Sequence, residues 1–322
     1  MNRRIVNIFI IIGLFLIVIL PGWTTVTAQE KAVSVGNKNF TEQYILGQMI
    51  KQLLEADGFT VEYRPDLTSM ALRAGMKSGE IDICADYTGT AWMIHLKRKY
   101  EPGTGHRAVY ENVKKADKEN GFLWLDPIWN NNSYALASWP EFTEKHGLKN
   151  LSDLAALYRK KDGEILTFIN FEFSARPDGL YALEDVYDFN IARSHLKTAT
   201  PGASLLSLEE HKAKVAMVFG TDPAIAEHGW HVYLDNKSVF PPYDLTPYVR
   251  RETLETHPEI KEILTALSAS FPGKEGALIT PRLVEKCQQI WRRLNAEVDV
   301  DKKDPEKVAR RYLLENKLIE EK

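Results

Sequence analysis

The chain has 322 residues, of which 44% are hydrophobic and 26% are charged, and this composition excludes a disordered or fibrous protein. Its formal net charge of −3 argues against nucleic acid as a partner, because that binding requires a basic surface. The length suits two α/β units better than one small core.

The N-terminal segment has the layout of a secretory signal peptide. Arg3 and Arg4 precede an apolar run over residues 5–20, and the small residues at 26–28 offer a cleavage site. An uncleaved membrane anchor is the alternative, but the run is slightly short for a membrane span. We predict a signal peptide at 1–28, no lipid anchor because no Cys lies near the cleavage site, and a mature protein free in the periplasm.

Strand and helix patterns alternate in the first part of the mature chain. Residues 39–42 resemble a helix capping box, and apolar rows follow in which Ile45, Met49 and Leu53 form one line. Gly58 is expected to end this helix. We predict strands at 31–36, 59–63 and 80–85, with helices between them. This order indicates a sheet flanked by helices, and residues 86–90 follow the third strand, where such sheets bind ligands.

A second α/β unit is expected from about residue 135 to residue 239, after a break at 130–133. Before it we predict helices at 91–99 and 108–120, an irregular stretch at 123–129, and an extended segment at 134–138. Within it we predict helices at 151–158 and 179–186 and strands at 166–169 and 213–219. After a boundary at 240–243 the chain is expected to be largely helical, with Thr280-Pro281 and Asp304-Pro305 as helix starts.

No common enzyme motif occurs in the sequence. A Gly-x-Ser-x-Gly elbow, a phosphate-binding glycine loop and a zinc-type His/Cys pair are all absent. His228 and His231 have a suitable spacing for a metal, but no third ligand stands near them. Asp86 and Asp222 follow strands, as many Asp residues do. We therefore expect no metal site, no cofactor and no catalysis.

The cysteines and tryptophans each leave two alternatives. Cys84 and Cys287 would form a disulfide if they meet in the fold, but Cys287 lies on the apolar stripe of a predicted helix, which favours two buried free thiols. Trp92, Trp124 and Trp129 could line a binding site, but tryptophan more often packs in a core.

Several segments, taken in order, resemble the osmoprotectant-binding proteins of ABC importers, the glycine betaine/choline/carnitine family. The similarity spans nearly all of the mature chain. The segments that carry it are Val33-Ser34-Val35-Gly36-Asn37-Lys38-Asn39-Phe40-Thr41-Glu42-Gln43 and those at 78–82, 86–90, 131–136, 176–180, 221–222, 240–243 and 308–316.

The resemblance implies an α/β, two-lobed periplasmic-binding-protein fold of type II. It has two hinge crossings, which we place near Tyr134 and Phe240, and a ligand cleft between the lobes. Lobe 1 would contain residues 29–134 plus 241–322, and lobe 2 residues 135–240.

The resemblance also implies an aromatic cage for a quaternary ammonium. Carried over residue by residue, its positions are Tyr87, Tyr134, Phe219 and Tyr243; Phe219 departs from the family, which usually has Tyr there. A trimethylammonium has no N–H to donate, but aromatic faces attract it, each by about 0.5–2 kcal/mol. Four faces would supply several kcal/mol toward binding, roughly the amount that micromolar affinity requires.

Relatives whose ligand carries a carboxylate clamp it with positions that match Lys38, Thr90 and Arg176. Arg suits this role through its two-pronged guanidinium. Asn132 occupies a position near the cage that is acidic in some relatives. Lys38 and Arg176 have an alternative role in a salt bridge between the lobes. The loop at 68–70, where relatives often have a glycine pair, is expected to border the pocket.

We therefore predict the substrate-binding component of an ABC importer, a monomer that passes its ligand to a membrane permease. Glycine betaine, choline, carnitine, proline betaine and ergothioneine are all candidate ligands. The alternatives are a periplasmic sensor or regulatory binding protein and, less favoured, an enzyme on the same fold.

Overall fold

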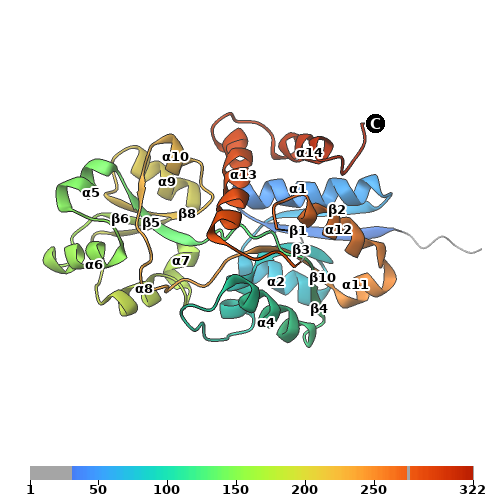
Figure 1. Ribbon diagram of the computed structural model, residues 1–322, viewed down its shortest axis with the longest axis horizontal. Helices are drawn as coiled ribbons and strands as arrows, with labels where there is room; N and C mark the ends of the chain where they lie inside the picture. The colour runs from blue at the N-terminus through green and yellow to red at the C-terminus, as the bar shows by residue number, and fades with distance from the viewer. Residues whose placement is uncertain (1–30, 274–275, 322) are drawn as a thin grey trace, which may run out of the picture. The chain divides into compact units, whose positions relative to one another are not determined.

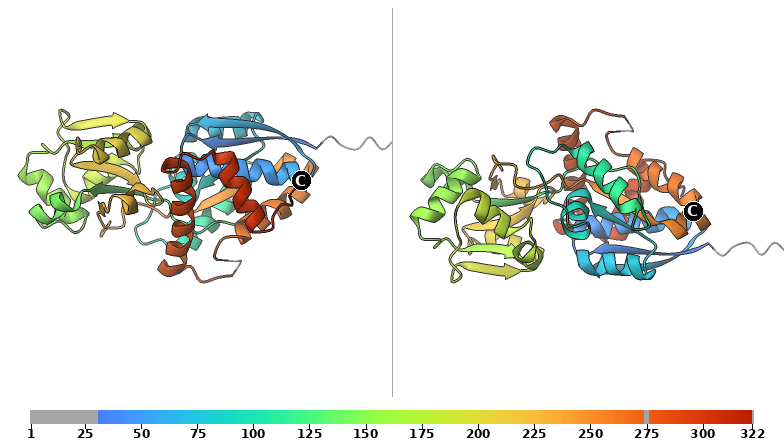
Figure 2. Two further views of the ribbon diagram at one scale, coloured as in Figure 1. Left: turned by 90° about the horizontal axis from the view of Figure 1, so that it is seen from above. Right: turned by 90° about the horizontal axis from the view of Figure 1, so that it is seen from below.

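The computed structural model describes residues 31–273 and 276–321. The predicted signal peptide at 1–28 lies outside the described residues. Figures 1 and 2 show two β-sheets, each with helices packed against it.

The first sheet has the strand order β2-β1-β3-β10-β4. β1 runs parallel to β2 and β3, whereas β10 is antiparallel to both β3 and β4. β3 is buried at every residue because β1 and β10 flank it. The strands of this sheet are β1 (Ala32–Lys38), β2 (Thr60–Leu67), β3 (Ile83–Tyr87), β4 (Phe122–Trp124) and β10 (Leu245–Arg250).

The second sheet has the order β7-β6-β8-β5-β9. β6 is parallel to β7 and β8, and β5 is antiparallel to β8 and β9. The chain therefore passes from the first sheet to the second after β4 and returns before β10. The strands of the second sheet are β5 (Tyr134–Ser138), β6 (Thr167–Asn170), β7 (Leu196–Ala199), β8 (Val215–Phe219) and β9 (His231–Val232). The predicted lobe boundaries stay predictions.

Helices connect the strands within each sheet. Those that accompany the first sheet before the crossing are α1 (Thr41–Ala56), α2 (Ser69–Ser78), α3 (Thr88–Thr90), the π-helix η1 (Ala91–His95) and α4 (His106–Lys118). Those of the second sheet are α5 (Pro140–His146), α6 (Leu151–Lys160), α7 (Phe171–Ala175), α8 (Leu180–Tyr187), α9 (Pro201–Glu209) and α10 (Ala224–Glu227).

The C-terminal helices return to the first sheet. α13 and α14 pack against α1, whose predicted apolar rows are buried. Thr280 and Asp304 cap α13 and α14 with their side chains, and a proline follows each cap, as predicted. The helices are α11 (Arg251–Thr256), α12 (Glu259–Ala269), α13 (Pro281–Asp299) and α14 (Pro305–Glu315).

Strand β10 was not predicted. Its central Pro247 argues against an inner strand because proline has no N–H to donate, yet β10 lies between β3 and β4. The carbonyl of Pro247 accepts a hydrogen bond from the Leu125 amide (2.9 Å). A local sequence pattern cannot indicate this contact, because its two residues are far apart in the chain.

Three further local predictions were wrong. The stretch at 123–129, predicted to be irregular, begins inside strand β4. Residues 91–99 do not form a continuous helix, because the π-helical turn ends at His95. The predicted capping box at 39–42 is also absent, since the N-cap of α1 is Phe40 and has no side-chain cap bond. The Thr41 hydroxyl instead donates to Asp299 (2.6 Å), and Glu42 is buried.

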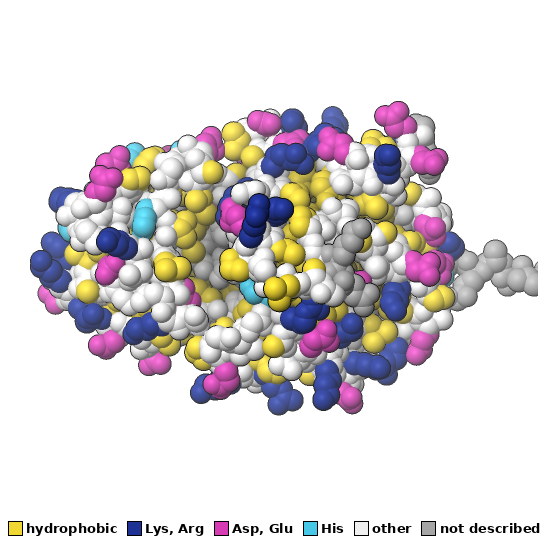
Figure 3. Space-filling view, viewed as in Figure 1, with side chains coloured by type: hydrophobic (Ala, Val, Ile, Leu, Met, Phe, Trp, Pro, Cys, Tyr) yellow, Lys and Arg dark blue, Asp and Glu magenta, His cyan; other side chains and the backbone are white. Residues whose placement is uncertain are grey.

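Charge is mixed on one face of the molecule. On the face shown in Figure 3, Lys and Arg side chains are interspersed with Asp and Glu. No helix within the described residues is long and apolar enough to cross a membrane.

Candidate ligand-binding pocket

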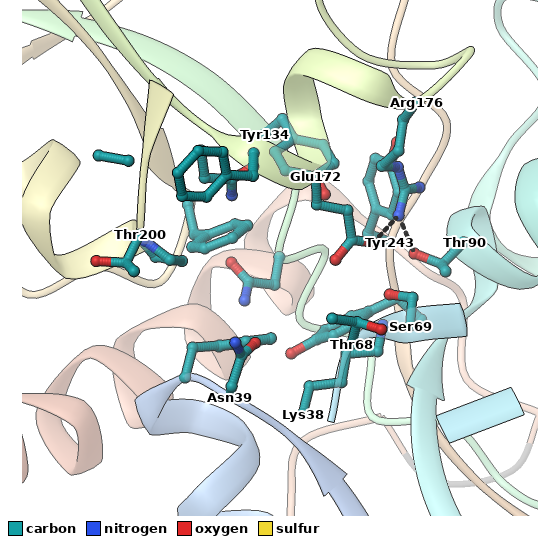
Figure 4. A pocket seen from close by; sticks show the side chains of 18 residues that line it. Lys38, Asn39, Thr68, Ser69, Thr90, Tyr134, Glu172, Arg176, Thr200 and Tyr243 are labelled. Atoms are coloured by element: carbon teal, nitrogen blue, oxygen red, sulfur yellow. Dashed lines mark hydrogen bonds and ion pairs between the residues drawn. The ribbon is translucent and has the colours of Figure 1, made fainter. Parts of the chain in front are cut away.

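One cavity of about 160 Å³ brings together side chains from both sheets. Lys38, Tyr87 and Phe219 are the last residues of β1, β3 and β8, and strand ends are where α/β sheets carry binding residues. All eight residues predicted from the sequence line this cavity: Lys38, Tyr87, Thr90, Asn132, Tyr134, Arg176, Phe219 and Tyr243. Figure 4 labels Lys38, Thr90, Tyr134, Arg176 and Tyr243 among them.

Aromatic rings form much of the wall. Tyr134 is central: its ring centroid lies 5.4 Å from that of Phe219 and 5.5 Å from that of Tyr243, which it meets edge to face. Tyr134 and Phe219 are paired across β5 and β8, so the sheet register itself sets their spacing. Such clustered rings present the negative faces that attract a cation.

The hydroxyl groups of two of the predicted cage tyrosines are held by carboxylates. Tyr87 donates to Glu42 (2.7 Å), and Tyr243 donates to Asp178 (2.6 Å). Burial and the nearby carboxylate charge raise the pKa of both phenols, so both stay protonated. The two rings are therefore oriented by their hydroxyl groups.

Phe40 is a pocket residue that the sequence analysis missed. Its ring stacks on Phe219 (centroids 5.2 Å apart) and on Tyr87 (6.2 Å). It joins the rings of the two sheets into one cluster. Its position two residues after the end of β1 was a signal, but the predicted capping box assigned this segment a purely structural role.

Lys38 has a carboxylate partner inside the protein. Its ammonium forms an ion pair with Asp86, and both side chains are buried. Asp86 also bonds to the His95 ring (2.8 Å). Although burial favours the protonated acid, the Lys38 charge and the His95 bond hold the pKa of Asp86 below its ordinary value. The Lys38 ammonium lies 5.1 Å from the Tyr87 ring centroid.

Arg176 is likewise paired. Its guanidinium makes two hydrogen bonds to the carboxylate of Asp178 (2.8 and 2.6 Å) and further bonds to Glu172 (3.0 Å) and Thr90 (3.2 Å); Figure 4 shows Arg176 beside Thr90 and Glu172. The guanidinium carbon lies 5.3 Å from the Tyr134 ring centroid. Three pocket residues thus hold one another in place.

These pairs decide against one alternative. Lys38 pairs with Asp86, and Arg176 with Asp178 and Glu172, so each ion pair stays within one predicted lobe. Neither residue makes the salt bridge between lobes that the sequence left open. The bond between Arg176 and Thr90 does connect the two predicted lobes, but it is a hydrogen bond to a hydroxyl.

Residues beyond the eight complete the lining. Asn132 donates to Glu42 and accepts from the Thr221 amide. Thr68 and Ser69 line the pocket. The segment at 68–70, predicted as a loop, is instead the N-cap and the start of α2, and Met70 is exposed. The other lining residues are Asn39, Phe40, Asn170, Phe171, Glu172, Ala199, Thr200 and Pro201.

The remaining candidates lie elsewhere. Cys84 and Cys287 are free and buried, which decides between the two alternatives. Trp92, Trp124 and Trp129 pack in a separate cluster beside the first sheet. Within 31–273 and 276–321, no group of three or more His, Cys, Asp or Glu side chains could hold a metal ion.

The chain is similar to known proteins over most of its length. A family model described as the substrate binding domain of ABC-type glycine betaine transport systems matches residues 31–315. A glycine-betaine-binding protein of Pseudomonas aeruginosa is 32% identical, and the match covers 91% of each chain.

Two further relatives are similar over most of the chain. The solved structure of apo YehZ from Escherichia coli aligns with a TM-score of 0.60 at 29% identity, covering 89% of this chain and 99% of that one. An ergothioneine transport permease/ergothioneine binding protein of Helicobacter pylori is 30% identical over 88% of this chain and 48% of its own length. The two-sheet architecture thus matches the predicted two-lobed fold.

Proposed function

The chain belongs to the family of substrate-binding domains of ABC-type glycine betaine transport systems, and from this premise we propose that it captures a quaternary-ammonium compound in the aromatic pocket. One observation carries the proposal: the four ring positions expected from the sequence line a single cavity. Rings from both sheets would surround the cation once the ligand is bound.

The internal partners of Lys38 and Arg176 affect how a carboxylate at the other end of the ligand could be bound. Lys38 and Arg176 would each have to share their charge between an internal carboxylate and a carboxylate of the ligand. Thr90 is already bonded to Arg176. We propose that this clamp contributes less than the rings, so that choline, which lacks a carboxylate, is bound as well as glycine betaine.

The family supports a proposal for the chain's cellular role. We propose export through the signal peptide at 1–28, a monomer in the periplasm, and delivery of the ligand to a membrane permease. We also propose that the ligand is released unchanged. Prolonged incubation followed by recovery of intact ligand would support this, and a modified ligand would favour the enzyme alternative.

A calorimetric titration of the mature chain tests ligand capture. We expect choline, glycine betaine, carnitine or ergothioneine to bind, and Tyr134→Ala to weaken that binding by about tenfold or more, equal to about 1.4 kcal/mol. Tyr181→Ala is the matched control, because Tyr181 is 66% exposed and does not line the pocket. Failure of all four compounds to bind the wild-type chain would refute the proposal.

A further inference from the structure

Glu42 is a buried carboxylate behind the wall of the pocket. It is 1% exposed and accepts hydrogen bonds from Tyr87 Oη (2.7 Å), Thr221 Oγ1 (2.6 Å), Asn130 Nδ2 (3.2 Å) and Asn132 Nδ2 (3.2 Å). No Lys, Arg or His of the described residues forms an ion pair with it.

The surrounding bonds require an acceptor at this position. The Asn130 side-chain oxygen accepts from the Leu245 amide (3.1 Å), and that of Asn132 accepts from the Thr221 amide (3.2 Å). Both amide nitrogens must therefore face Glu42. An ionised carboxylate is the form that accepts from all four donors. Burial raises the pKa of Glu42, and these four bonds oppose part of that rise.

A buried charge without a counter-ion is costly. Lys38 and Arg176 are each balanced by a buried aspartate, but Glu42 is balanced only by neutral donors. Two of these donors, Tyr87 and Asn132, line the cavity. The unbalanced negative charge thus lies one side chain away from the place where we expect a cation.

The acidic character continues on this side of the pocket. Asp222 lines a neighbouring cleft together with Glu42 and Asp299. Burial, together with the charges of Asp299 and Glu42, raises the pKa of Asp222 to about 7. The negative charges of Glu42 and Asp299 would attract a positive charge in the adjacent cavity.

We propose that Glu42 is the counter-charge of the bound quaternary ammonium and determines the pocket's preference for a cation over an uncharged molecule of the same shape. It acts without touching the ligand, by two routes. Its charge is weakly screened in a buried site, and its bond to the Tyr87 hydroxyl increases the electron density of the ring that faces the cation. The inference rests on the proposed function.

Glu42→Gln separates charge from geometry. The Gln oxygen replaces the atom that accepts from Tyr87, Asn130 and Asn132, and its amide nitrogen donates to the Thr221 hydroxyl. The variant should therefore fold and melt at the wild-type temperature or above it, because a costly buried charge has been removed.

The test compares ligands that differ only in charge. Choline is paired with dimethylbutanol, and glycine betaine with dimethylbutanoate; in each analogue a carbon atom replaces the charged nitrogen. By calorimetry, we expect Glu42→Gln to weaken binding of the cationic member by about tenfold or more and to change binding of its carbon analogue by about twofold or less. A merely structural role would weaken both members equally.

Thr221→Ser is the matched control, because it changes a neighbour of Glu42 but keeps the hydroxyl that donates to the carboxylate. It should leave the affinity ratio between cation and analogue at the wild-type value. An unchanged ratio in Glu42→Gln would overturn this inference and leave the proposed function standing. A wild-type chain that binds neither choline nor glycine betaine, nor any other quaternary amine, would overturn both.

Discussion

At the scale of single residues, the pocket is defined by how its charges are balanced. Arg176 and Asp178 are 5% and 1% exposed and bond through both oxygens of the carboxylate. We expect Arg176→Ala to lower the free energy of unfolding by about 3–5 kcal/mol, because it leaves a buried charge alone. Urea unfolding measures this. The double variant with Arg176→Met and Asp178→Asn removes both charges and should recover most of the loss; equal loss in both variants would contradict the argument.

At the scale of elements, the short helix α3 sets the position of one cage ring. A Cβ atom at Gly89 would lie 2.7 Å from the Tyr243 ring and 2.9 Å from Pro241, which is too close for either to remain in place. We expect Gly89→Ala to displace the ring and to weaken ligand binding by about tenfold, or about 1.4 kcal/mol, in a calorimetric titration. Gly105→Ala, where nothing lies within 4 Å, is the control; equal affinities of the two variants would refute this role of α3.

At the scale of the whole molecule, buried acids and one histidine determine the response to pH. Burial raises the pKa of Asp222 to about 7, so its stabilising contribution is full below pH 4 and is lost as the pH rises through 7. For His106, burial is outweighed by the bond to Asp244, and its pKa is raised; its contribution is lost in the same direction. Urea unfolding should show higher stability at pH 5 than at pH 8, with a smaller difference in Asp222→Asn. Higher stability at pH 8 would contradict this.

The parts of the fold that depend on neighbouring residues were predictable. The buried rows of α1 follow from helical periodicity, and the caps at Thr280 and Asp304 follow from a side chain that bonds to an amide one turn away. The eight pocket residues were located through family resemblance. Their meeting in one cavity could not be derived from spacing, since Lys38 and Tyr243 are brought together only by the return of the chain through β10.

The sequence by itself determined the alternation of strands and helices, the segments that resemble a family, and the ring types available for a cation. Only the tertiary structure decided which charges are balanced. Lys38 finds its partner at Asp86, Pro247 lies inside a sheet, and Glu42, in the first turn of α1, is a buried acceptor of side-chain hydrogen bonds. The physical reason is that hydrogen bonds within one helical turn are determined by residues close together in the sequence. Burial and electrostatic pairing depend instead on residues that meet only after folding.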